Sequence, residues 1–111
     1  MNVYDTANKL ASELKNSPEY LTYKKIKEEL NKNNDIKEKM MQFEKARYDA
    51  QLEALKGEEA QKEKMEEAQK IYAELIQNDF AMKYFDAELK FNVLLADVNK
   101  IIAESVQDVL I

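Results

Sequence analysis

The sequence predicts an all-α protein, an elongated array or bundle of about five helices that ends in a long C-terminal helix. The first observation is that its 111 residues include one Gly and one Pro, the two residues that break helices most often. The second is a composition rich in Ala, Leu, Glu, Lys and Gln, which are strong helix formers. The third is the pattern of residues 80–111, where apolar side chains recur at steps of three and four, as on one buried helical face.

Length and composition indicate one domain over residues 1–111 and disfavour several classes of function. With 22 acidic against 17 basic residues the net charge is −5, which gives no general attraction to nucleic acid or to anionic membranes. The sequence has no Cys and no His, and therefore lacks disulfides, thiolate ligands and the commonest general base. No phosphate-binding loop or catalytic motif is present, so we expect no enzymatic activity, no cofactor and no metal site.

Targeting signals are also missing from the sequence. The N-terminus lacks the basic start and apolar centre of a signal peptide. The longest uninterrupted apolar run has four residues, 93–96, which is far too short to span a membrane. We therefore expect a cytoplasmic protein without a membrane contact.

The first helix is expected over residues 3–15. Asn2 can cap its start, and Asp5 in the first turn suits the positive end of the helix dipole. Its apolar side chains form one stripe, which consists of Val3, Ala7, Leu10, Ala11 and Leu14. This stripe predicts that one face of the helix packs on another element.

Ser17 and Pro18 separate the first helix from the second. Pro18 disfavours a helical conformation at Ser17, and Ser17 is a good N-cap for a helix that begins with Pro. The second helix is expected to run from Pro18 to about residue 30. Tyr20 and Tyr23 are expected to fix this turn against a later helix.

Residues 31–35 are rich in Asn and Asp, which favour caps over helix interiors. A third helix is expected over residues 36–55, with Asn34 or Asp35 as its cap. Its main apolar row contains one charged residue, Arg47, whose stem can pack while its head reaches solvent. A second apolar row consists of Met41, Tyr48, Leu52 and Leu55.

Gly57 is the one glycine, and two interpretations are open. It can end the third helix as a left-handed C-cap, or it can lie inside one helix over residues 36–77 at a cost of about 1 kcal/mol. We favour a break, because Glu58 and Glu59 suit the first turn of a new helix over residues 59–77. Asn78 and Asp79 then cap the last helix.

The last helix carries the candidate site, which is an interface between helices. As one helix, residues 80–111 would be about 45 Å long, whereas a compact domain of this size has a radius of gyration near 13 Å. One face is apolar and one is charged. Along a flank, Asn92 and Asn99 could pair across a symmetric contact, and Ala96 and Ala103 allow close helix approach. We predict a homodimer or higher homo-oligomer whose interface draws on Phe85, Phe91, Asn92, Leu94, Leu95, Ala96, Val98, Asn99, Ile101, Ile102 and Ala103.

Three alternatives to this interface are open. The flank can be an ordinary boundary facing another helix of the same chain. The Lys-rich residues 24–47 can touch RNA, although acidic residues interleave the cations throughout, as on a solvated face with ion pairs. A metal site made only of carboxylates is a third and weaker possibility.

Several stretches give the sequence a resemblance to a known family. These are NVYDTANKLASEL, then SPEY, then the ND break, and then NDFAMKYFDAELKFNVLLADVNKII. Over nearly the whole chain they resemble the bacterial YlbF/YmcA helical family, and within it the YheA-type branch. None of these stretches is a chemical motif.

The resemblance implies a small, cytosolic, all-helical, oligomeric protein of Gram-positive bacteria with a regulatory or adaptor role. YlbF and YmcA themselves join a third protein in a complex that influences competence, sporulation and biofilm formation and assists an RNA-processing ribonuclease. Those relatives hold iron–sulfur clusters with cysteines. This sequence has no Cys, so no cluster ligand carries over.

Overall fold

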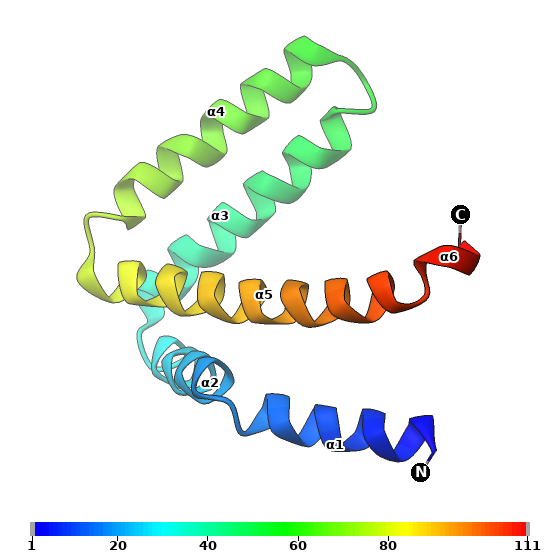
Figure 1. Ribbon diagram of the computed structural model, residues 1–111. Helices are drawn as coiled ribbons and strands as arrows, with labels where there is room; N and C mark the ends of the chain where they lie inside the picture. Colours follow the sequence, from blue (N-terminus) through cyan, green and yellow to red (C-terminus); the bar gives the residue numbers. More distant parts are fainter. Residues whose placement is uncertain (1, 111) are drawn as a thin grey trace. The chain divides into compact units, whose positions relative to one another are not determined.

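The computed structural model describes residues 2–110, and every regular element in this range is a helix. The helices are α1 (Val3–Lys15), α2 (Pro18–Leu30), α3 (Asn34–Glu53), α4 (Glu58–Leu75), α5 (Asp79–Ser105) and α6 (Gln107–Leu110) (Figure 1). The predicted all-α class with a long C-terminal helix is confirmed. By internal contacts the chain forms two compact units, unit 1 with residues 2–27 and 84–110 and unit 2 with residues 28–83. That residues 1–111 form one domain stays a prediction.

The predicted bounds of α1 and α2 are confirmed, and so are their caps. The Asn2 Oδ1 atom accepts a hydrogen bond of 2.8 Å from the backbone N–H of Asp5. The Ser17 Oγ atom accepts one of 3.2 Å from the N–H of Tyr20 and donates one of 2.7 Å to the carbonyl of Leu14. One serine side chain thus ends α1 and starts α2, because it satisfies backbone groups that both helix ends leave unpaired.

Helix α3 begins and ends two residues before its predicted bounds of 36 and 55. Asn33 is the cap, in place of the expected Asn34 or Asp35, and its Oδ1 atom accepts a hydrogen bond of 3.4 Å from the N–H of Ile36. All three residues have a suitable side chain, so the sequence pattern alone does not distinguish them. At the other end, residues 55 and 56 bond to carbonyls three residues earlier, which tightens the last turn.

Gly57 interrupts the chain between α3 and α4, so the predicted break is confirmed. Its role differs from the prediction, because Ala54 is the C-cap of α3 and Gly57 is the N-cap residue of α4. The φ of Gly57 is 139° and its ψ is 165°, a region that only glycine adopts readily. Helix α4 therefore starts one residue earlier than predicted, and it ends at Leu75 rather than 77.

Helix α5 is long but does not run to the end of the chain, so that part of the prediction was wrong. It ends at Ser105, whose Oγ atom donates a hydrogen bond of 2.6 Å to the carbonyl of Ile102. Serine hydroxyls compete in this way with the backbone N–H groups that would continue a helix. The 27 residues of α5 extend over about 40 Å. As predicted, Asn78 caps its start, with its Oδ1 atom 3.0 Å from the N–H of Ala81.

Unit 2 contains most of the buried side chains. Helices α3 and α4 lie side by side in opposite directions and form a hairpin (Figure 1). Alanines on the facing sides permit this close approach, because they add little volume between the helix axes. The buried residues of unit 2 are Leu30, Met40, Phe43, Ala46, Ala50, Ala68, Leu75 and Ala81. In the described range, no helix has both the length and the hydropathy required to cross a membrane.

Candidate interaction surface

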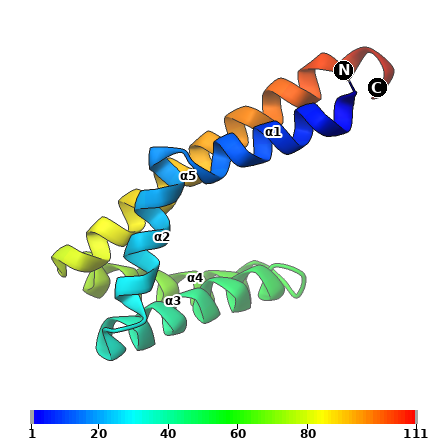
Figure 2. The same ribbon diagram turned by 90° about the horizontal axis from the view of Figure 1, so that it is seen from below.

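Unit 1 buries very little of its apolar surface. Among its described residues only Tyr84 and Ala87, both in α5, are buried, and α1 has no buried residue. Figures 1 and 2 show α1 running along the C-terminal half of α5 in the opposite direction. The two helices therefore share a side of unit 1 without enclosing a core of their own.

An aromatic cluster joins α2 to the first half of α5. The ring of Tyr23 lies 5.7 Å from that of Tyr84 and 5.8 Å from that of Phe91, and the ring of Tyr20 lies 5.9 Å from Phe91. Rings at these separations attract each other through their edges and faces in addition to the area that they bury. The prediction that Tyr20 and Tyr23 fix the turn against a later helix is confirmed.

A polar contact completes this cluster. The hydroxyl of Tyr23 donates a hydrogen bond of 3.3 Å to the Oε2 atom of Glu88. Burial raises the pKa of the Tyr23 phenol far above its ordinary value of 10.0, and the neighbouring Tyr84 and the charge of Glu88 raise it further. The phenol is therefore protonated at neutral pH and serves as a donor. The hydrogen bond and the ring contacts together hold α2 against α5 within unit 1.

The predicted interface residues divide into two groups along α5. Phe85, Phe91, Leu94 and Val98 are half-buried within the chain itself. The exposed group consists of Asn92, Leu95, Ala96, Asn99, Ile101, Ile102 and Ala103. Up to Val98 half-buried and exposed residues alternate around the helix, whereas every described residue after Val98 is exposed.

Ile101 and Ile102 are the clearest examples of large apolar side chains that stay exposed on this surface. They continue the helical face of Leu94 and Val98, which predicts that they are core residues. Their exposed fractions are nevertheless 68% and 51%. Half or more of each side chain therefore stays in contact with solvent in the described chain.

Sequence reasoning missed part of this open surface. Leu89, Val93, Val109 and Leu110 are large exposed apolar residues that were not among the predicted interface residues. Val109 and Leu110 were predicted to continue one straight helix, whereas they lie in the separate helix α6. The apolar run at residues 93–96 could have revealed the exposure of Val93. Four consecutive residues of a helix cannot all lie on one face, so at least one apolar side chain of the run must point away from the core.

The Lys-rich stretch of residues 24–47 does not form one surface within a single unit. Lys24, Lys25 and Lys27 belong to unit 1, and the cations from residue 32 onward belong to unit 2. Lys39 pairs with Glu74 at 3.8 Å, and the ammonium of Lys27 lies 5.1 Å from the centre of the Tyr23 ring. These contacts fit the interleaved ion pairs expected of a solvated face. RNA contact through this stretch stays a prediction.

No group of three or more acidic residues among residues 2–110 is arranged to hold a metal ion. The exposed part of the predicted interface on α5 consists of apolar side chains and the amides of Asn92 and Asn99.

Comparison with known proteins finds one matching family model and several similar UPF0342 proteins. A family model described as "Control of competence regulator ComK, YlbF/YmcA" matches residues 3–107. A UPF0342 protein of Caldicellulosiruptor bescii is 34% identical over 106 residues, which is 96% of this chain and 89% of the relative. A UPF0342 protein of Symbiobacterium thermophilum is 35% identical over 104 residues, 94% of this chain and 93% of the relative. A third, from Bacillus pumilus, is 32% identical over 108 residues, 97% of this chain and 92% of the relative.

Proposed function

This chain belongs to the YlbF/YmcA family, and we propose that it is a non-enzymatic regulatory or adaptor protein that works through protein contacts as a homodimer. The description of the family names control of a competence regulator, and neither it nor the names of the relatives state a reaction. These descriptions support regulation as the general role. The apolar surface that unit 1 leaves open is the observation that supports a role through contacts.

Burial is the main source of the free energy that holds a domain together, at about 25 cal/mol for each Å² of apolar surface removed from water. Unit 1 has two buried side chains among its described residues, and large apolar groups such as Ile101 and Val109 stay in water. An exposed apolar surface of this kind is typical of an interface. Association would supply the burial that α1 and the C-terminal half of α5 do not provide for each other.

A second copy of the chain is the occupant that the C-terminal half of α5 fits best. In a two-fold interface the same surface lies on both subunits, so a polar group near the axis meets its own copy and must be able both to donate and to accept. Asn92 and Asn99 meet this requirement, because an amide both donates and accepts, and they are seven residues apart on one side of the helix. Ala96 and Ala103 follow the same spacing and let the two helix backbones approach.

Light scattering at low micromolar concentration tests the proposal. The expected mass is twice the 13.0 kDa of one chain. Ile101→Asp should shift the protein to the mass of one chain, because the dimer would then bury an unpaired carboxylate in an apolar contact. Lys100→Asp is the matched control, since Lys100 is exposed on the charged side of α5 and its contact is an ion pair with Glu104 at 3.9 Å. A wild-type mass of 13.0 kDa would overturn the homodimer.

A further inference from the structure

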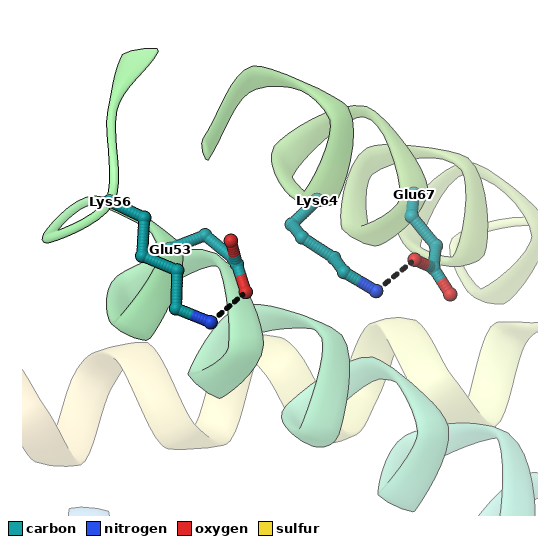
Figure 3. Close-up of polar contacts among 4 residues, drawn as sticks. All are labelled: Glu53, Lys56, Lys64 and Glu67. Carbon is teal, nitrogen blue, oxygen red and sulfur yellow. Dashed lines mark hydrogen bonds and ion pairs between the residues drawn. The ribbon is translucent and has the colours of Figure 1, made fainter. Parts of the chain in front are cut away.

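The α3–α4 hairpin of unit 2 has two different faces. One face is charged and its charges are paired within the hairpin, since Lys39 contacts Glu74 at 3.8 Å across the two helices. Towards the loop, Lys56 contacts Glu53 at 3.4 Å and Lys64 contacts Glu67 at 3.6 Å (Figure 3). Paired charges of this kind suit permanent contact with water.

The other face is hollowed and largely apolar. A groove of about 450 Å³ runs between the two helices, and we call it the hairpin groove. It is lined by Phe43, Arg47, Ala50, Gln51, Gln61, Met65, Ala68, Gln69 and Tyr72. Arg47 is the one charged residue of this lining, so the two faces of the hairpin differ sharply in charge.

The shape of the hairpin groove follows from the sizes of its side chains. Ala50 and Ala68 are buried and form a low floor. Phe43 and Tyr72, whose rings lie 5.6 Å apart across the two helices, close one end of this floor. Met65 and Tyr72, with exposed fractions of 45% and 40%, rise above it on the α4 side. A floor of small residues between large ones is a hole that accepts a large side chain from a facing helix.

Arg47 adds a charge preference to this shape. Its guanidinium lies 5.4 Å from the centre of the Phe43 ring, at the side of the groove. Its ion pair with Glu44, at 3.5 Å, joins two side chains that are each about half exposed, and such exposed pairs are weak. The guanidinium can therefore turn to a carboxylate of a bound molecule, which it can hold through two parallel hydrogen bonds.

A second copy of the same groove is a poor occupant. Arg47 lies between Phe43 and Gln51 on the α3 side of the lining, near the middle of the groove. A two-fold contact that sets the middle of one α3 against the middle of the other would bring Arg47 close to the same residue of the other copy, and this repulsion disfavours such self-pairing. A different protein avoids this repulsion. The other polar residues of the groove, Gln51, Gln61 and Gln69, are uncharged and would not repel it.

We propose that the hairpin groove binds an amphipathic helix of a partner protein. Large apolar side chains of that helix, spaced by three and four residues, fill the holes above Ala50 and Ala68, and an Asp or Glu beside this row pairs with Arg47. The inference rests on the proposed adaptor role, for which it supplies the class of partner. It does not depend on which surface forms the homodimer.

The test uses phage that display a library of amphipathic helices of about 20 residues, with apolar and flanking positions randomised, a length that covers the groove. The purified full chain is the target. We expect enriched sequences with large apolar residues in one row and an acidic residue at a constant offset. A fluorescent peptide of the most enriched sequence should then shift the amide NMR signals of the hairpin groove residues.

Variants of the full chain test whether the groove prefers a peptide with an acidic residue at the position facing Arg47. Arg47→Glu should lower the affinity for the acidic peptide at least tenfold. It should raise the affinity for a peptide in which Lys replaces the acidic residue. Lys45→Glu is the matched control, because it changes the same charge on the outer side of α3 and should leave affinity within twofold. Met65→Lys, at a partly exposed wall, should also abolish binding, and Met41→Lys on the outer row should not.

Three results would overturn the inference. They are no enrichment over the unselected library, NMR shifts confined to α5, and an equal loss of affinity in Arg47→Glu and Lys45→Glu. Light scattering of the same samples shows independently whether the chain is a homodimer. A dimer without peptide binding rejects only the groove, and a monomer that binds the peptide with the expected charge preference rejects only the homodimer.

Discussion

The hydroxyl of Tyr23 in α2 donates a hydrogen bond of 3.3 Å to the carboxylate of Glu88 in α5, 65 positions later in the chain. Tyr23→Phe removes this donor and keeps the ring against Tyr84 and Phe91. We expect the free energy of unfolding to fall by about 1–2 kcal/mol, because the half-buried carboxylate loses a partner. Urea denaturation measures the change. Tyr4→Phe, at a residue with an exposed fraction of 81%, is the control, and an equal effect of both variants would contradict the role of Tyr23.

The same phenol predicts a dependence of stability on pH. Burial raises the pKa of Tyr23 in the folded chain above the ordinary 10.0, so the folded state retains this proton after the unfolded state has lost it. The contribution to stability is complete below pH 10 and declines as the pH rises further. The stability of the wild type relative to Tyr23→Phe should therefore shrink between pH 10 and 12, which denaturation of both proteins in parallel measures. A constant difference would mean that the phenol titrates alike in both states.

The sequence predicted the helices of this chain well wherever a cap or a breaker was unambiguous. Asn2 and Ser17 each have a side chain that satisfies backbone N–H groups at one position, and the bounds of α1 and α2 followed from them. Where Asn33, Asn34 and Asp35 offered three equivalent caps, the start of α3 was misplaced. The end of α5 was missed because Ser105 has an ordinary helical propensity and ends the helix through one local hydrogen bond.

The candidate site was only partly predictable for a different reason. Periodicity identifies which residues share a face of a helix, and it places Ile101 and Ile102 on the face of Leu94. It does not tell how far a neighbouring helix covers that face, because coverage depends on packing between residues distant in sequence. The hairpin groove was missed for the same reason. Ala50 and Ala68 form its floor only once α3 and α4 lie side by side.

Gly57 gives a prediction about the loop of the hairpin. Its φ of 139° is unfavourable for any residue with a Cβ atom, although no atom lies within 4 Å of the place where a Cβ would be added. Gly57→Ala should therefore destabilise the chain by about 1–3 kcal/mol through backbone strain alone. Thermal unfolding followed by circular dichroism measures this. Ala54→Gly, at a residue with helical φ and ψ, is a control for which conformational entropy gives the smaller cost of about 0.5–1 kcal/mol. No loss of stability in Gly57→Ala would mean that the loop relaxes into another conformation.

Leu94 and Ile101 lie on one face of α5, and the homodimer predicts that they respond differently to the same substitution. Leu94 is half-buried by its own chain, so Leu94→Asp should lower the stability of each subunit by about 3 kcal/mol, as expected for a charge placed in an apolar contact. Ile101 is 68% exposed in the single chain, so Ile101→Asp should leave the subunit almost unchanged and should act on association alone.

Denaturation at several protein concentrations separates the two effects. Association stabilises the folded state by mass action, so the midpoint of the wild type should rise with protein concentration. In Ile101→Asp the midpoint should no longer depend on concentration and should equal that of the wild type at high dilution. In Leu94→Asp it should lie lower at every concentration. If the midpoint of the wild type were itself independent of concentration over a hundredfold range, the exposed end of α5 would not be a contact between copies of this chain.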